Sequence, residues 1–257
     1  AMNLAQNRVQ FTPDVLPSDI TGCSMYVKEK NEFVYQPGAV MCNLLLADEI
    51  NRTSAKTQSA LLEVMEEGTV TVDGVTRKVP EPFVVIATEN PIGSAGTQML
   101  PESQLDRFLI CIQMGYPSPE DEIDILMSQS ERKTLEEIQP VVDASILTKM
   151  QRETAQVFIH ETVCRYIVDL VNATRSHELV TLGLSTRGAL AVAKLAKANA
   201  YIEGRAFVLP KDVEKVFPAA AVHRLKCSTK VTMNKGASMD IIEEILKSVK
   251  QPRPEKK

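Results

Sequence analysis

The stretch LLLADEINR, residues Leu44 to Arg52, ends a run of aliphatic residues with two adjacent carboxylates. Asp48 and Glu49 repel each other when both are ionised, and burying them without a counter-charge costs several kcal/mol. We therefore expect a positive group close to this pair. The run before it, Val40 to Ala47, has the length of a buried strand, or of a helix end that leads into one.

Two further aliphatic runs follow along the chain. Residues 83–87 (FVVIA) end in Thr88, Glu89 and Asn90, and residues 108–114 (FLICIQM) form the third run. Continuous apolar runs are typical of parallel strands covered on both faces. Because ligands bind beyond the carboxyl ends of such strands, we expect Asp48, Glu49 and Asn90 to lie close together.

Local signals divide the rest of the chain into two parts. A strand is expected at 7–12, hairpins at 22–38 and around Asp73-Gly74, and a helix that begins at Thr53 or Ser54 and ends at Gly68. Helices are expected at about 118–129, 143–156, 160–176, 185–203, 210–226 and 238–249. These signals predict an αβ domain over residues 1–116, a helical domain over 117–250 and a disordered tail over 251–257.

The composition excludes several classes of protein. A net charge of −4 over 257 residues argues against a general nucleic-acid binder. No apolar stretch approaches the roughly 20 residues of a membrane span, and the amino end lacks a signal pattern, so we expect a cytoplasmic protein with no membrane partner. Five scattered cysteines with no CxxC pair fit reduced intracellular thiols better than disulfides or a zinc site.

A hard divalent cation would supply the counter-charge for the acidic pair. Mg²⁺ that bridges nucleotide phosphates is held by a carboxylate and water, which suits Asp48. Glu49 could then orient or deprotonate an attacking water, and Asn90 could hydrogen-bond the same water.

Several linked segments resemble the MoxR family of AAA+ ATPases, and they occur in the family's order and spacing: LLLADEINRTSAKTQSALLEVMEEGTVTVDG, PEPFVVIATENPI, LPESQLDRF, GLSTRGAL and VLPKDV. The resemblance implies an AAA+ P-loop NTPase-type parallel sheet, followed by an α-helical lid bundle, with ATP and Mg²⁺ as cofactors. It also implies that Asp48 coordinates Mg²⁺, that Glu49 is the catalytic carboxylate and that Asn90 is the sensor-1 residue.

Two arginines complete the set of residues that the resemblance implies. Arg107 in LDRF matches the arginine finger, which reaches the nucleotide of a neighbouring subunit in a homo-oligomeric ring, commonly a hexamer. Arg187 in STR matches sensor 2 on the lid. Arg187 is also expected in the first turn of its helix, where the helix dipole disfavours a cation unless a phosphate is bound.

The resemblance further implies a biological role. Family members use ATP to remodel or assemble a protein client, often one with a von Willebrand factor A domain, and some assist metal-cofactor insertion. The hairpin at Asp73-Gly74 is either a simple cover for the sheet edge or, by the same resemblance, a contact to a client in the ring pore.

One departure from the family is large. None of the 11 glycines is followed by Lys, so GxxxxGK[ST], the Walker A loop, does not occur in this chain. In the family this loop and its central strand precede the position of Asn3, and we expect the natural gene product to carry them. The chain as given is expected to bind ATP more weakly than ~1 mM and not to hydrolyse it appreciably.

Other functions fit parts of the pattern. The chain could be a magnesium-chelatase-like subunit, or a nucleotide-free interaction module that uses these surfaces for docking. A nucleic-acid motor is disfavoured by the net charge. Taken singly, an acidic pair at a strand end, an Asn before Pro or a surface Arg is commonly structural.

Overall fold

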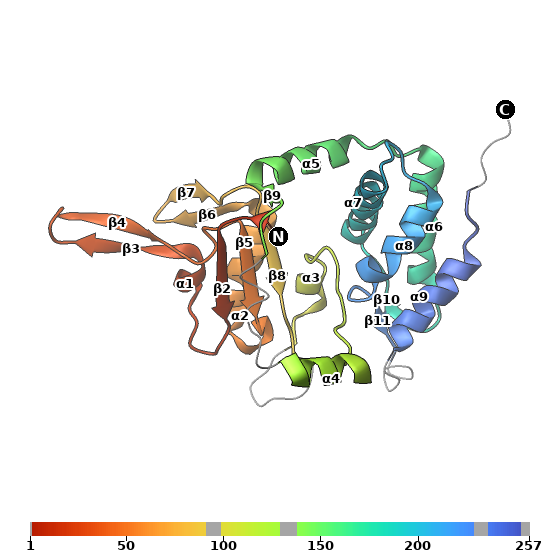
Figure 1. Cartoon of the computed structure of the whole chain (residues 1–257), viewed down its shortest axis with the longest axis horizontal. Helices are drawn as coiled ribbons and strands as arrows, with labels where there is room; N and C mark the ends of the chain where they lie inside the picture. Colours follow the sequence, from red (N-terminus) through yellow and green to blue (C-terminus); the bar gives the residue numbers. More distant parts are fainter. Residues whose placement is uncertain (1, 91–98, 129–137, 229–235, 253–257) are drawn as a thin grey trace. The chain divides into compact units, whose positions relative to one another are not determined.

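The computed structural model describes residues 2–90, 99–128, 138–228 and 236–252. The chain forms two compact units (Figure 1). The sheet unit comprises Leu4–Arg107 and Ala144–Gln151, and the helical unit comprises Ala1–Asn3, Phe108–Asp143 and Arg152–Lys257. In the part of the chain that is described, no helix is both long and apolar enough to cross a membrane.

Three parallel strands form the centre of the sheet unit, in the order β2-β5-β8. They are β2 (Gln6–Gln10), β5 (Leu44–Asp48) and β8 (Val84–Ala87). Alternate residues of β5 point into the core, so that Leu45 and Ala47 are fully buried. Because all three strands run in one direction, their carboxyl ends lie at one edge, where Gln10 is opposite Asp48 and Ala47 is opposite Ala87.

The strand β8 is less covered than its continuous apolar sequence predicts. Val84 is 37% exposed and Ile86 is 52% exposed, so one face of this strand is solvated. The expectation that both faces of the sheet are covered is therefore wrong for β8. In the described sheet β8 is an edge strand, with β5 as its neighbour.

The third predicted strand, residues 108–114, is absent, although all seven residues are described. The segment runs along the helical unit, where the amide of Cys111 donates to the carbonyl of Ala219 at 2.9 Å. Ile112 is 70% exposed and Met114 is 93% exposed. An apolar segment forms a strand only where another strand supplies backbone partners, and its sequence alone does not reveal whether that partner is present.

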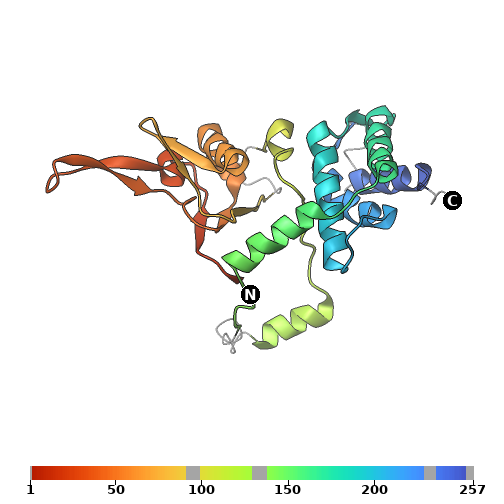
Figure 2. The same ribbon diagram turned by 90° about the horizontal axis from the view of Figure 1, so that it is seen from above.

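Two antiparallel hairpins extend from the sheet unit (Figures 1 and 2). The first is formed by β3 (Gly22–Val27) and β4 (Glu32–Pro37), and the second by β6 (Thr69–Val72) and β7 (Val75–Lys78). The Arg77 guanidinium of the second hairpin lies 4.0 Å above the ring of Tyr35 in the first. This cation–π contact joins the two hairpins at their bases.

The helix α2 of the sheet unit is capped as the sequence predicts. Ser54, rather than Thr53, is the N-cap of α2 (Ala55–Glu67), where its hydroxyl accepts from the amide of Thr57 at 3.3 Å. Gly68 ends this helix in the left-handed conformation. The remaining short elements are α1 (Pro17–Thr21), the 3-10 helix η1 (Ile50–Arg52) and α3 (Glu102–Leu105).

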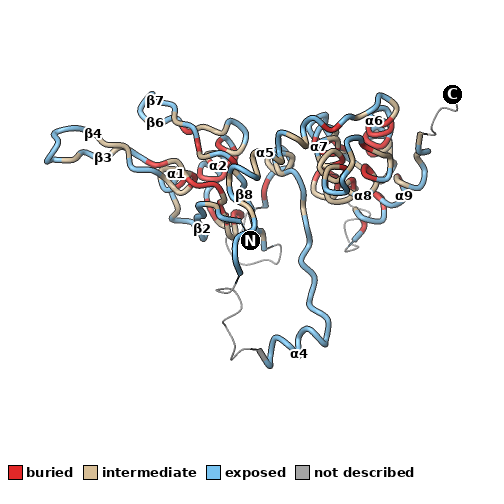
Figure 3. The backbone as a smooth tube through the Cα atoms, turned by 45° about the horizontal axis from the view of Figure 1, so that its top comes forward, coloured by how far each residue is buried: buried red, intermediate tan, exposed pale blue. Residues whose placement is uncertain are grey.

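The helical unit packs around one apolar core (Figure 3). Its largest buried side chains include Tyr166, Leu170 and Phe217. The helices are α4 (Pro119–Ser128), α5 (Ala144–Gln156, shared with the sheet unit), α6 (Glu161–Ser176), α7 (Thr186–Ile202), α8 (Pro210–Ala221) and α9 (Ala237–Ser248). Two short two-stranded sheets complete the unit. In one, β1 (Met2–Asn3) pairs with β9 (Val142–Asp143), and in the other, β10 (Val180–Leu182) pairs with β11 (Lys226–Cys227).

The predicted helices agree with these bounds to within about two residues, except at the end of α8. That helix ends at Ala221, and Lys226 lies in β11, so the expected extension to residue 226 is wrong. Residue 129 of the expected helix at 118–129 and residues 253–257 of the expected tail lie outside the described residues.

A buried carboxylate fixes the start of α8. Asp212 is 1% exposed and accepts two hydrogen bonds from the Arg205 guanidinium, at 2.5 and 2.7 Å, and one from Asn199 at 2.7 Å. It also accepts from the amide of Leu209 at 2.7 Å, which caps the helix. Burial alone would raise the pKa of Asp212, but the hydrogen bonds from Arg205 and Leu209 outweigh it and lower the pKa below its ordinary value.

The Arg205→Ala variant should lower the free energy of unfolding of the helical unit by about 2–4 kcal/mol, because it leaves Asp212 buried without its counter-charge. Urea unfolding followed by circular dichroism measures this change. Lys215→Ala is the matched control. It breaks the surface pair Lys215–Glu203 (3.1 Å), and should cost less than about 1 kcal/mol. Equal losses in the two variants would contradict this account.

The same carboxylate predicts a pH dependence. Because the pKa of Asp212 is lower in the folded chain than in the unfolded chain, its stabilising contribution is present above about pH 4 and is lost as the pH falls through the folded pKa. Thermal unfolding between pH 6 and pH 3 should therefore show a smaller loss of stability in Asp212→Asn than in the unmodified chain.

Candidate functional site

The acidic pair lies where β5 ends and is tied to the end of β8. The hydroxyl of Thr88 donates to Oδ1 of Asp48 at 2.6 Å and accepts from the backbone amide of Glu49 at 2.9 Å. One threonine side chain therefore positions both acidic residues. The hydrogen bond from Thr88, followed in size by that from Arg8, lowers the pKa of Asp48 below its ordinary value.

The backbone of Glu49 has an uncommon conformation. Its φ of 55° and ψ of 49° lie in the left-handed region, which residues other than glycine, asparagine and aspartate adopt rarely and at a cost of order 1 kcal/mol. The following amide, of Ile50, donates to the carbonyl of Thr88 at 3.0 Å and helps to hold this turn. Backbone strain of this kind clusters at functional sites, where it directs a side chain.

The positive charge expected near the pair is supplied by two arginines. Nη2 of Arg8, on β2, lies 2.6 Å from Oδ2 of Asp48, and Nη1 of Arg52 lies 2.6 Å from Oε2 of Glu49. The side-chain amide of Gln10, also on β2, donates to Oε2 of Glu49 at 3.0 Å. Arg8, Gln10 and Arg52 were not predicted as site residues, although the alternation in residues 7–12 places Arg8 and Gln10 on one side of their strand.

Asn90 lies on the loop that continues β8. Its carbonyl accepts from the side-chain amide of Asn51 at 3.3 Å, and Asn51 follows the acidic pair in η1. The structure thus brings Asp48, Glu49 and Asn90 to neighbouring positions at the same edge of the sheet. Between Thr88 and Asn90, burial raises the pKa of Glu89.

The two predicted arginines lie in different units. In the sheet unit, Nη1 of Arg107 lies 2.9 Å from Oε2 of Glu66 and 3.1 Å from the carbonyl of Leu62, so Arg107 is held against the carboxyl half of α2. In the helical unit, Arg187 is exposed in the first turn of α7, after the N-cap Ser185. The expected place of Arg187 at a helix start is confirmed.

The oxygen atoms at this edge suit a hard cation. Carboxylate, hydroxyl and amide oxygens come from the ends of β5 and β8, and the Asp48 side chain is 22% exposed. Among the described residues, no group of three or more His, Cys, Asp and Glu is arranged to hold a metal ion. Asp48 and Glu49 are the residues at this edge that could hold a hard cation, because such ions prefer carboxylate oxygens.

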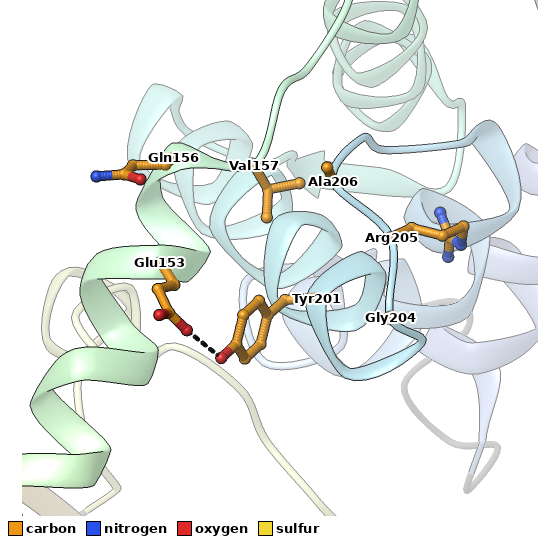
Figure 4. Close-up of a pocket in the computed structure, with 7 residues that line it drawn as sticks. All are labelled: Glu153, Gln156, Val157, Tyr201, Gly204, Arg205 and Ala206. Atoms are coloured by element: carbon orange, nitrogen blue, oxygen red, sulfur yellow. Dashed lines mark hydrogen bonds between the residues drawn. The ribbon is translucent and has the colours of Figure 1, made fainter.

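A pocket of about 440 Å³ lies within the helical unit (Figure 4). Its wall includes Glu153 and Tyr201, whose side chains meet in a 2.5 Å hydrogen bond that raises the pKa of Tyr201. Arg205, which also lines the pocket, forms an ion pair with Asp212. None of the residues identified from the sequence lines this pocket, so its lining does not point to the nucleotide chemistry expected at the end of β5.

Comparison with known proteins defines the class. The family described as "ATPase family associated with various cellular activities (AAA)" matches residues 1–110, and the AAA lid domain matches residues 172–245. The crystal structure of a candidate ATPase from Cytophaga hutchinsonii superposes with a TM-score of 0.89 at 36% identity, covering 98% of this chain and 79% of that one. The fold is that of an AAA+ ATPase, with a parallel sheet and a helical lid.

Sequence relatives narrow the class to one family. The uncharacterized protein YeaC of Bacillus subtilis is 46% identical over 245 residues, which cover 95% of this chain and 77% of YeaC. Chaperone MoxR1 of Mycobacterium tuberculosis is 39% identical over 256 residues, which cover 96% of this chain and 67% of MoxR1. Magnesium-chelatase subunits also match, at 30% identity for the subunit from Acidiphilium rubrum. The chain belongs to the MoxR family of AAA+ ATPases.

Thr88→Val tests whether the shared hydroxyl positions the acidic pair. The variant removes the donor to Asp48 and the acceptor for Glu49, so the pKa of Asp48 should rise and stability should fall by about 0.5–1.5 kcal/mol. Carboxyl ¹³C NMR titration measures the pKa. Thr71→Val removes an equivalent hydroxyl that bonds Thr76 in the second hairpin, and it should leave the pKa of Asp48 unchanged. An unchanged pKa in Thr88→Val would disprove this role.

Proposed function

We propose that this protein is an ATP-driven chaperone of the MoxR type, whose hydrolytic site lies at the edge where β5 and β8 end. The observation that carries the proposal is the hydroxyl of Thr88, which contacts Oδ1 of Asp48 and the amide of Glu49 at once. It supports a single site built from two strands that are separated by about 40 residues in sequence.

Each residue at the edge has a proposed role. Asp48 holds Mg²⁺, which when bound neutralises charge on the nucleotide phosphates. Glu49 orients an attacking water and accepts its proton, and the rare backbone conformation of Glu49 sets the direction of its carboxylate. Asn90 hydrogen-bonds the same water from the neighbouring strand end.

The two arginines are proposed to act on the nucleotide from outside the acidic pair. Arg187 binds phosphate from the first turn of α7, where an anion reverses the unfavourable effect of the helix dipole on the cation. Arg107 acts as an arginine finger on the nucleotide of an adjacent subunit, which requires a homo-oligomeric ring, proposed to be a hexamer. Its contact with Glu66 is partly exposed, so the guanidinium can exchange partners at low cost.

The proposed client is a protein, including a protein that carries a von Willebrand factor A domain or that acquires a metal cofactor. The name of the relative Chaperone MoxR1 supports a chaperone role. The two hairpins support a client surface, because the outer part of the first hairpin exposes Met25, Tyr26 and Phe33.

The chain by itself should bind MgATP more weakly than ~1 mM, because it contains no Walker A sequence to supply backbone amides and a lysine to the phosphates. Isothermal titration calorimetry with MgATP measures the affinity. Micromolar binding by this chain would show that the residues at the end of β5 and on the lid suffice to hold the nucleotide.

A mixing experiment tests the roles of Glu49 and Arg107 together, in a form of the protein that includes a phosphate-binding loop upstream of Asn3. Glu49→Gln and Arg107→Ala should each be inactive. An equal mixture should recover about a quarter of the wild-type turnover, because a quarter of the subunit contacts then pair an intact Glu49 with an intact Arg107. A phosphate-release assay measures the turnover.

The control for the mixture is Arg165→Ala. It removes an arginine that pairs with Glu161 on the same helix, with both side chains more than 70% exposed, and it should retain full activity. Failure of the mixture to regain activity would contradict catalysis across subunits. Full activity of Glu49→Gln would contradict its proposed catalytic role, and a wild-type protein without turnover would leave the nucleotide-free interaction module as the better account.

A further inference from the structure

The carboxylate of Asp48 already has a cationic partner on its own sheet. In the parallel register of β2 and β5, Gln10 is opposite Asp48, and Arg8 lies two residues earlier on the same side of β2. The long side chain of Arg8 reaches forward along the strand, and Nη2 lies 2.6 Å from Oδ2 of Asp48. Its second contact, to Oε1 of Gln10 at 3.4 Å, keeps the guanidinium on this side of the sheet.

The two oxygens of Asp48 accept from different donors, whereas one oxygen of Glu49 accepts from two donors. Oδ1 of Asp48 accepts from Thr88 and Oδ2 from Arg8. Oε2 of Glu49 accepts from both Gln10 and Arg52. Each carboxylate is therefore neutralised by a different arginine, and the oxygen of Asp48 that does not accept from Thr88 accepts from Arg8.

We propose that Arg8 is a resident counter-cation that competes with the divalent metal for Oδ2 of Asp48, so that metal binding requires Arg8 to move away. This inference rests on the proposed role of Asp48 as a metal ligand. The guanidinium lies 2.6 Å from Oδ2 and repels a second cation there, so it opposes the approach of Mg²⁺, whose ligands lie only about 2.0–2.1 Å away.

The exposure of the pair indicates that Arg8 tunes metal binding rather than blocking it. The Arg8 side chain is 64% exposed and the Asp48 side chain 22% exposed, and ion pairs of this type are weak because water screens them. A doubly charged ion whose shell is completed by phosphate oxygens outcompetes such a pair, whereas a metal ion alone does so poorly. Arg8 thus weakens metal binding by the cost of breaking one exposed ion pair, without preventing it.

The test uses Mn²⁺ alone as the probe and the nucleotide-free chain, with free Mn²⁺ measured by electron paramagnetic resonance. Arg8→Gln should bind Mn²⁺ about two- to five-fold more tightly than the unmodified chain, which is the range expected from loss of one exposed ion pair. Arg52→Gln is the matched control, because it removes the same charge from the neighbouring carboxylate. It should produce a smaller change.

The outcomes separate this inference from the proposed function. If Asp48→Asn abolishes binding but Arg8→Gln does not strengthen it, Asp48 is the metal ligand and the role of Arg8 is overturned. Equal strengthening by Arg8→Gln and Arg52→Gln would also overturn it, because the effect would then be general electrostatics. If Asp48→Asn binds Mn²⁺ as the unmodified chain does, the proposed metal role of Asp48 fails, and this inference fails with it.

A second readout needs no manganese. The side-chain Nε–Hε NMR signal of Arg8, assigned by its loss in Arg8→Gln, should shift on addition of excess Mg²⁺ toward its position in Asp48→Asn, since both changes free the guanidinium from the carboxylate. A signal that differs in Asp48→Asn but does not respond to Mg²⁺ would show that the ion pair persists beside the metal, which contradicts competition.

Discussion

The candidate site depends on the parallel register of β5 and β8. Ala47 lies opposite Ala87, so the next residues of the two strands, Asp48 and Thr88, leave the sheet side by side. Their 2.6 Å hydrogen bond then fixes one carboxylate oxygen of Asp48. The same hydroxyl of Thr88 accepts a hydrogen bond from the backbone amide of Glu49. A shift of one residue in the register would turn every side chain of β8 to the other face and separate these groups.

Electrostatics explains why an acidic pair is tolerated at this edge. Arg8 and Arg52 each neutralise one carboxylate, and Thr88 and Gln10 satisfy further oxygens. The pair is therefore stable before any ligand binds. Because both ion pairs are partly exposed, they hold the side chains in place, and breaking either of them costs little free energy.

Much of this arrangement follows from sequence because it depends on local signals. Aliphatic runs that end in polar groups identify β5 and β8, Asp73-Gly74 identifies the turn of the second hairpin, and Ser54 and Gly68 bound α2. The proximity of Asp48, Glu49 and Asn90 then follows from a general property of parallel sheets. The MoxR resemblance, which the comparisons confirm, adds the helical lid.

The parts that sequence did not predict depend on contacts between distant segments. Arg8 and Asp48 are 40 residues apart, and no local pattern identifies the carboxylate that a given arginine contacts. The segment at 108–114 has the composition of a strand, but a strand also needs a partner. The left-handed backbone of Glu49 is disfavoured by propensity, and the hydrogen bond from its amide to Thr88 joins two distant segments.

The cation–π contact between Arg77 and Tyr35 gives the two hairpins a mechanical connection. The hydroxyl of Tyr35 is itself anchored to the carbonyl of Thr21 at 2.7 Å, at the end of α1. A force on either hairpin is therefore shared through the contact of the guanidinium with the tyrosine ring and passed to the base of the sheet unit. The two hairpins are therefore tied to each other near their bases, and the contact between Arg77 and Tyr35 leaves their turns unconnected.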